Sequence, residues 1–233
     1  MLKTDIRKFK LSNYLKYFSA RLLILLLITD SIFITLYLIY TFPDFHFSSL
    51  ILDKFVLYDH LLLLTQDQSY GEIFQYIKEL WIMLLLGFGY CQRKKLIFLS
   101  WSLFYGYLLL DDALSIHEKS GAVVSNFLGF KEILNIRSVD FGEVLVSMMV
   151  AISFLLLISW GYATAKYRER KYSNILILLI LTLSIPGIVF DLLQVMVSNN
   201  DILYSIFSLL EDGGEHIVIS LTLAFVYAID WQF

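Results

Sequence analysis

Residues 211–216 read Glu-Asp-Gly-Gly-Glu-His and place four ionisable side chains inside a run of apolar residues. The apolar run is long enough to cross a bilayer as an α-helix. Ionisable side chains inside such a helix cost enough free energy to indicate a function. On a helix that advances about 100° per residue, these four side chains fall within a sector of roughly 140°. One helix face therefore presents three carboxylates and an imidazole, groups that transfer protons or bind cations.

A second stretch of this kind lies at residues 111–118, where Asp111-Asp112 is followed by His117-Glu118. The candidates for catalysis or proton transfer are Asp111, Glu118, Glu143, Asp191 and Glu211. The candidate metal ligands are His117, Glu118, Glu211, Glu215 and His216, and the side chains expected to support them are Asp112, Asp212, Ser115 and Ser220. The spacing of these residues matches neither the HExxH zinc motif nor the ExxH pair of di-iron bundles.

Charge balance is the reason to expect a metal. The acids of the apolar runs outnumber the nearby cationic or ionisable nitrogen side chains, Lys78, His117 and His216. In a low-dielectric bundle such acids must be protonated, hydrated or bound to a cation. Carboxylates mixed with imidazoles suit Zn, Fe or Mn better than Ca or Mg, so the predicted cofactor is a divalent ion of that class.

The composition predicts the kind of protein that must position these residues. The chain has 233 residues, of which 58% are hydrophobic and 17% charged, and its mean hydropathy is +0.72. Such values are typical of polytopic helical membrane proteins, whose partner is the lipid bilayer. A single cysteine excludes an internal disulfide, nothing indicates a nucleic-acid surface, and no oligomeric state is predicted.

The order of apolar runs predicts an all-α transmembrane bundle of six spans. A basic segment, residues 1–21, precedes a single transmembrane domain, residues 22–233. The expected spans are residues 22–42, 72–91, 96–118, a fourth from about 141 to just before Lys166, 173–197 and 202–229. Pro186-Gly187 is expected to kink the fifth span.

The positions of the basic residues predict the orientation of these spans. Thirteen of the eighteen Lys and Arg residues lie in three segments that alternate with acidic loops: 1–21, 93–95 and 166–171. Basic loops stay in the cytoplasm, so both termini are expected inside a plasma or inner membrane. With this orientation, the acids of all six spans lie in the middle or outer part of the bundle and are expected to form one cluster.

The two motifs also support a resemblance to known proteins. The Asp111-Asp112…His117-Glu118 pattern and the later Glu211-Asp212-Gly213-Gly214-Glu215 stretch resemble an uncharacterised group of bacterial multi-pass membrane proteins. This resemblance covers most of the chain and indicates which residues matter, but it implies no activity. A looser similarity is to the alkaline ceramidase-like membrane hydrolases, which hold zinc within a helical bundle; their paired C-terminal histidines are absent, with only His216 present.

These observations favour a metal-dependent membrane enzyme that acts on a lipid-like or amphiphilic substrate near the outer leaflet. A proton- or cation-coupled transporter is the alternative, because intramembrane carboxylates also carry ions. A third possibility is an assembly or scaffold subunit whose acids dock another membrane protein. Whether the chain is an enzyme therefore stays open at the level of the sequence.

Overall fold

The computed structural model describes residues 18–41, 64–65, 68–131, 137–197 and 199–229, and every element in these ranges is helical. The elements are α2 (Ala20–Thr41), α4 (Tyr70–Arg93), α5 (Leu96–Leu114), α6 (Ile116–Leu128), α7 (Ser138–Thr164), α8 (Tyr167–Ser184), the π-helix η2 (Ile185–Phe190), α9 (Asp191–Met196) and α10 (Asp201–Tyr227). The all-α class predicted from the sequence is confirmed.

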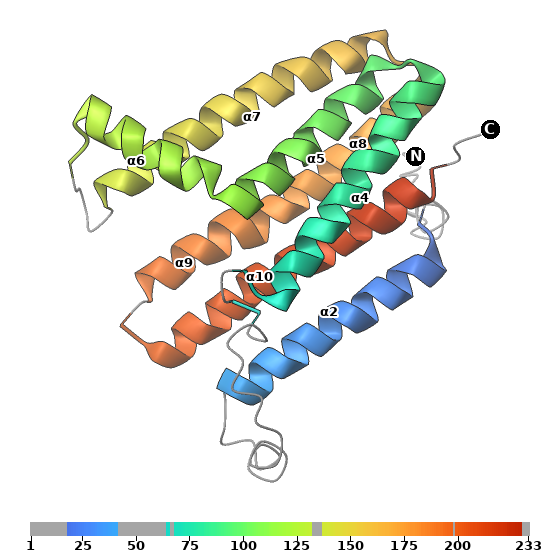
Figure 1. The fold of residues 1–233 in the computed structure, drawn as a ribbon. Helices are drawn as coiled ribbons and strands as arrows, with labels where there is room; N and C mark the ends of the chain where they lie inside the picture. Colours follow the sequence, from blue (N-terminus) through green and yellow to red (C-terminus); the bar gives the residue numbers. More distant parts are fainter. Residues whose placement is uncertain (1–17, 42–63, 66–67, 132–136, 198, 230–233) are drawn as a thin grey trace, which may run out of the picture.

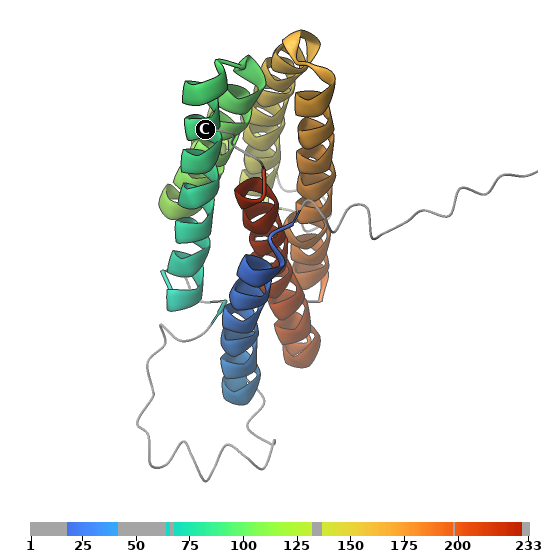
Figure 2. The ribbon, with the colours of Figure 1, turned by 90° about the vertical axis from the view of Figure 1, so that its right-hand side faces the viewer.

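The long helices run side by side along one direction of the molecule (Figures 1 and 2). The start of α2, the end of α10 and the turns at residues 93–95 and 165–166 lie at the same end, which we call the basic end. The opposite end, where α5 meets α6 and α9 is followed by α10, we call the acidic end. The backbone N–H of Ser19 donates to the carbonyl of Ala224 at 3.1 Å and joins the first helix to the last.

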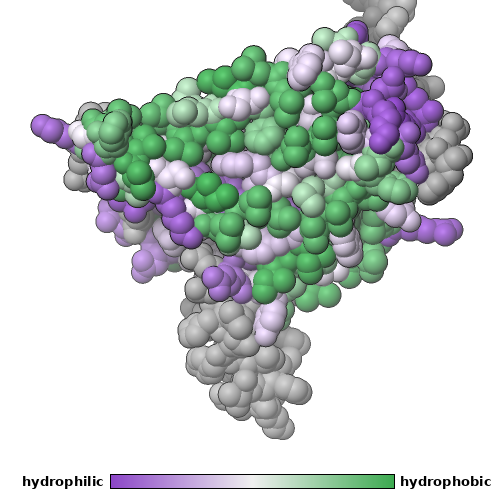
Figure 3. Space-filling view, turned by 45° about the horizontal axis from the view of Figure 1, so that its top comes forward, coloured by the Kyte–Doolittle hydropathy of each residue, from purple (hydrophilic) through white to green (hydrophobic). Residues whose placement is uncertain are grey.

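Four helical stretches are long and apolar enough to cross a membrane: Ala20–Ile39, Leu96–Leu114, Ser138–Thr164 and Tyr167–Met196. Their outward faces are apolar, as on α7, where Leu155 and Leu156 are 64% and 67% exposed. Figure 3 shows an apolar surface over the middle of the bundle and hydrophilic side chains at its two ends. This distribution fits a membrane protein, because lipid rather than water covers the apolar faces.

The half of the bundle toward the basic end is filled with apolar side chains. Ile82 and Leu86 of α4 pack with Trp101 and Tyr105 of α5 and with Phe225 of α10, and all five are at most 2% exposed. The indole Nε1 of Trp101 donates to Ser173 Oγ at 2.9 Å, so this buried polar atom is satisfied. The polar side chains described below therefore lie on the acidic side of a dry apolar layer.

The junction of α5 and α6 differs from the prediction that a third span reaches Glu118 and a loop follows it. Helix α5 ends at Leu114, Ser115 has a left-handed φ of 49°, and α6 follows at once. The carboxylate of Asp111 accepts the backbone N–H of His117 at 2.8 Å, in place of the carbonyl that a continuous helix would supply. The side chain of Asp111 thus ends one helix and begins the next.

Helix α6 folds back along α7 at a very short distance. A Cβ atom added to Gly142 would lie 2.0 Å from the carbonyl oxygen of Gly121, so only glycines allow this approach. The hydroxyl of Ser125 donates to the carbonyl of Ser138 at 2.6 Å and closes the hairpin. Residues 119–128, expected in a loop, are therefore part of a packed helix.

The fifth predicted span begins earlier than expected, at Tyr167 rather than residue 173, and contains a π-helical segment. This segment, η2, begins one residue before Pro186, whose missing N–H and ring disturb an α-helix. A Cβ atom on Gly214 of α10 would lie 2.9 Å from Pro186 Cβ, so α10 packs closely against η2.

Candidate functional site

A buried lysine holds three helices together through four polar contacts. Lys78 of α4 is fully buried, and its Nζ donates to Asp30 Oδ1 of α2 at 3.0 Å. The same nitrogen donates to the His216 carbonyl at 2.9 Å and to Ser220 Oγ at 3.1 Å, both on α10. Ser220 Oγ in turn donates to Asp30 Oδ2 at 2.5 Å. We call Asp30, Lys78, His216 and Ser220 the lysine network.

The imidazole of His216 lies beside both charged members of the lysine network. Its Nδ1 is 3.2 Å from Lys78 Nζ and 3.4 Å from Asp30 Oδ1. The three hydrogens of the Lys78 ammonium already have Asp30, the His216 carbonyl and Ser220 Oγ as acceptors, so the Asp30 carboxylate is the partner left for Nδ1. Lys78 and Asp30 compensate each other's charge, as a buried pair must.

A second polar group lies beside the lysine network and consists of the buried Gln75 and Glu79 and the half-buried Asp112 and Glu215, which we call the carboxyl cluster. Gln75 Nε2 donates to Glu215 Oε2 at 3.3 Å. The carboxyl of Asp112 lies near Gln75 and interacts electrostatically with Glu79. Two carboxyl groups this close in a bundle of low dielectric constant are costly to ionise together, so the pair is a candidate for binding a proton.

One oxygen of the carboxyl cluster stays unsatisfied. Glu79 is 1% exposed, and its Oε2 has no hydrogen-bond partner among the described residues. Glu79 follows Lys78 on α4, and Glu215 precedes His216 on α10, so both helices join the carboxyl cluster to the lysine network. The two groups form one continuous polar layer across the middle of the bundle.

The remaining predicted acids lie nearer the acidic end and form a third group, the acidic rim: Asp111, His117, Glu118, Glu143, Asp191 and Glu211. His117 Nδ1 lies 3.0 Å from Asp111 Oδ2, and their side chains are 34% and 13% exposed. Glu118 and Asp191 are exposed, and Glu211 interacts electrostatically with both Asp191 and Glu215. A row of acids therefore leads from the rim to the carboxyl cluster.

The structure distributes the predicted site residues over these three groups. Asp112 and Glu215 belong to the carboxyl cluster, and His216 and Ser220 to the lysine network. The two histidines expected to bind one ion have different partners: His117 pairs with Asp111, and His216 contacts Lys78. Ser115 forms the α5–α6 junction, and Asp212 is half-buried on α10.

These partners fit a divalent metal poorly. No group of three or more His, Cys, Asp and Glu side chains in the described ranges is arranged to hold a metal ion. At His216, the Lys78 ammonium lies 3.2 Å from the ring nitrogen that faces the polar layer, and its charge repels a cation.

Sequence reasoning gave too little weight to four residues of the polar layer: Asp30, Gln75, Lys78 and Glu79. The spacing of Gln75, Lys78, Glu79, Ile82 and Leu86 places them on one helix face, and all five are buried. On this face a lysine and a glutamate are combined with aliphatic residues at helical spacing. That combination is the sequence signal that identifies α4 as part of the site.

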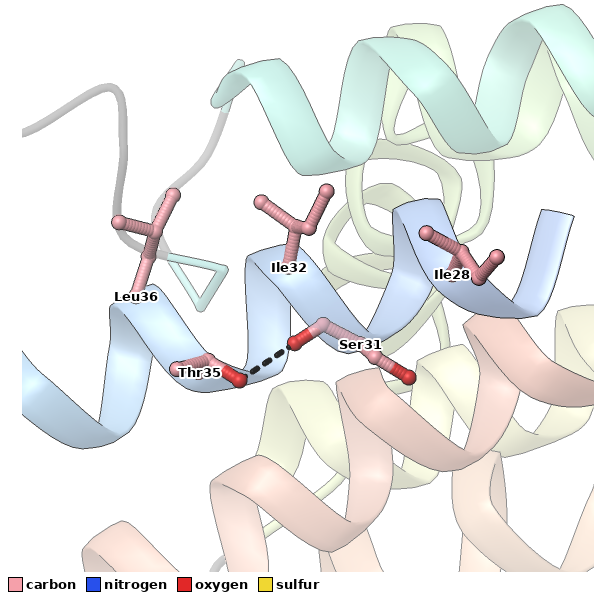
Figure 4. A pocket seen from close by; sticks show the side chains of 5 residues that line it. All are labelled: Ile28, Ser31, Ile32, Thr35 and Leu36. Carbon is pink, nitrogen blue, oxygen red and sulfur yellow. Dashed lines mark hydrogen bonds between the residues drawn. The ribbon is translucent and has the colours of Figure 1, made fainter. Parts of the chain in front are cut away.

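A surface hollow on α2 is unrelated to the polar layer. It is an open apolar depression on α2, lined by Ile28, Ser31, Ile32, Thr35 and Leu36 (Figure 4). The Thr35 hydroxyl donates to the Ser31 carbonyl at 2.7 Å, so this polar group is satisfied within the helix. No residue of the three groups lines the hollow.

The Asp111–His117 pair predicts a pH effect at the acidic rim. The hydrogen bond to Asp111 raises the pKa of His117 above its ordinary value, against the opposing effect of partial burial. A raised folded-state pKa means that this stabilisation is complete below pH ~6.5 and is lost as the pH rises through the raised pKa. Nuclear magnetic resonance of the imidazole should show the raised pKa, and Asp111→Asn should return it toward the ordinary value.

The nearby acids Glu118 and Glu143 act on His117 in the same direction but more weakly. Asp201→Asn, in the exposed first turn of α10, is the matched control and should leave the titration unchanged. An unchanged His117 titration in Asp111→Asn would contradict the pairing.

Comparison with known proteins gives a family but no activity. No curated protein and no solved structure matches the chain. The family model described as "Domain of unknown function (DUF8692)" matches residues 20–229, which include α2 through α10 and all three polar groups. The chain belongs to this family.

Proposed function

We propose that the chain is an integral membrane protein of six spans that binds and transfers protons at the carboxyl cluster, as part of a proton-coupled transporter. The spans are α2, α4, α5, α7, the continuous α8–η2–α9 unit and α10. The basic end faces the cytoplasm, because it gathers the Lys and Arg residues of the turns at 93–95 and 166–171. Both termini are then cytoplasmic, in the cell membrane.

The observation that carries the proposal is that two interacting carboxyl groups, the buried Glu79 and the half-buried Asp112, lie next to the Lys78–Asp30 ion pair. Ionisable groups inside membrane bundles mark ion pathways and proton relays. Lys78 and Asp30 hold charges that do not need to change, and they orient the backbone and imidazole of His216 beside Glu215. The carboxyl cluster is then the part that changes its proton count.

The acids suggest the order of proton transfer. A proton taken up at the acidic rim by Asp191 or Glu211 passes to Glu215, whose neighbour they are. Gln75 donates to Glu215 and lies near Asp112, whose carboxyl interacts electrostatically with Glu79. Toward the basic end the path meets the apolar layer, so this conformation exchanges protons with the acidic end, and transport requires a second conformation.

A membrane enzyme is the second candidate, and the Asp111–His117 pair favours it. A carboxylate that holds one imidazole nitrogen leaves the other to act as a general base at the membrane surface. Its substrate would be amphiphilic, because the pair lies at the acidic end of apolar helices. The proton-coupled function accounts for the buried groups as well, and we therefore prefer it.

Infrared spectroscopy tests the proposal directly. At neutral pH the wild-type protein should show a protonated carboxyl band, and Glu79→Gln and Asp112→Asn should each reduce its intensity. In sealed liposomes, both variants and Glu215→Gln should slow proton uptake at least tenfold, while the exposed control Asp201→Asn should not. A spectrum without any protonated carboxyl group would overturn the proton-binding function.

A further inference from the structure

We propose that the basic end carries a binding site for the phosphate headgroup of an anionic phospholipid, between the turns at residues 93–95 and 165–168. The residues that face the headgroup are Lys94, Lys95, Lys166 and Arg168. This inference does not depend on the proton-coupled function, since it concerns the opposite end of the bundle.

Close helix packing brings the two turns together. A Cβ atom on Gly161, near the end of α7, would lie 2.9 Å from the Cα of Ile97, near the start of α5. The hydroxyl of Ser100 donates to the carbonyl of Leu157 at 3.2 Å and holds the same two helices. Figures 1 and 2 both show the α4–α5 turn next to the α7–α8 turn.

The charge at this place is positive on both turns. Residues 93–95 and 166–171 contain seven Lys and Arg residues and a single acid, Glu169, which is 8% exposed and so contributes little to the surface. Like charges held this close repel one another, and a bound anion relieves the repulsion. An anion that spans both turns therefore stabilises their contact.

Part of this charge is held in a fixed position. Arg170 donates from Nε to the Tyr162 carbonyl at 3.1 Å and from Nη2 to the Ala163 carbonyl at 3.0 Å, which closes the α7–α8 turn. Arg168 Nε donates to the hydroxyl of Tyr172 at 2.8 Å, and its guanidinium lies over the same ring. Arg168 and Arg170 thus stabilise the turn on which the site is built.

The surroundings identify the anion as a lipid. Trp160 and Tyr167 flank the turn and are 65% and 85% exposed, and such aromatic residues collect where a membrane meets water. Below them, Leu155 and Leu156 of α7 are exposed and offer an apolar surface for acyl chains. A basic surface between helices at this depth suits a phospholipid headgroup with its tails along α7.

Native mass spectrometry of the full chain in detergent tests the site with phosphatidylglycerol, phosphatidylcholine and inorganic phosphate as probes. The wild type should bind phosphatidylglycerol more tightly than phosphatidylcholine. Lys95→Gln with Lys166→Gln should weaken phosphatidylglycerol binding about 25-fold, because each basic residue near an anionic headgroup contributes about fivefold, or ~1 kcal/mol. Raising the salt concentration should reduce the preference as well.

The matched control removes two charges at the acidic end of the bundle, Lys119→Gln with Lys131→Gln, and should keep wild-type affinity. Equal binding of the two lipids, or equal loss in the control, would overturn the proposal. Inorganic phosphate that binds as tightly as phosphatidylglycerol would overturn the assignment to a lipid and leave a soluble anion site.

Discussion

Replacing Lys78 by methionine should lower the free energy of unfolding by about 3–5 kcal/mol, the cost of leaving one partner of a buried ion pair alone. Lys78 Nζ is the partner of Asp30, of the His216 carbonyl and of Ser220, and all of these lose a hydrogen bond at once. Methionine fills a similar volume, so the loss reports charge and hydrogen bonding rather than a cavity. Unfolding in detergent, followed by circular dichroism, measures the change.

The double variant Lys78→Met with Asp30→Asn is the decisive control. It removes both charges, and its stability should recover much of the loss seen in Lys78→Met, because no unpaired charge remains. If Lys78→Met alone lowers the free energy of unfolding by less than about 1 kcal/mol, the pair does not hold α2 to the bundle.

The variant Gly142→Ala should destabilise the α6–α7 hairpin by about 1–3 kcal/mol or more, as expected for overpacking. Its Cβ would lie 2.0 Å from the Gly121 carbonyl oxygen, a backbone atom that cannot rotate away. Helix α6 should move off α7, and hydrogen exchange of residues 116–128 should become faster. The Asp111–His117 pair at the start of α6 should loosen with it.

Gly213→Ala supplies the matched control, since it makes the same change in a buried position of α10. There the added Cβ would meet Ile34 Cδ1 at 3.5 Å, an ordinary contact, so stability should change little. If both variants exchange equally fast in α6, the Gly121–Gly142 approach is not what holds the hairpin.

The long helices follow from the sequence because long apolar helices are encoded locally, by apolar runs bounded by charges. The predicted limits of the first span, 22–42, and the last, 202–229, lie within two residues of α2 and α10. The α5–α6 break does not follow, because residues 115–116 contain neither Gly nor Pro. A side-chain hydrogen bond within the junction decides it instead, because the Asp111 carboxylate accepts the backbone N–H of His117.

The candidate site was predictable in composition but not in arrangement. The helical rotation of residues 211–216 places Glu215 and His216 on the buried side, yet they face different partners, Gln75 and Lys78. Both partners belong to α4, which packs against α5 on one side and α10 on the other. The neighbours of a helix depend on tertiary packing, which one sequence does not contain.

The contact between the first and last helices constrains how the protein is made. Ser220 donates to Asp30, and the two residues are 190 positions apart in the chain. At the usual ribosomal speed of about 5–20 residues per second, Asp30 enters the membrane some 10–40 s before its hydroxyl partner exists. At first α2 has neither Lys78 nor α10 beside it, because both are made after Asp30. The Asp30 carboxylate therefore has no hydroxyl partner until α10 is made, and the packing of α10 against α2 completes its hydrogen bonds.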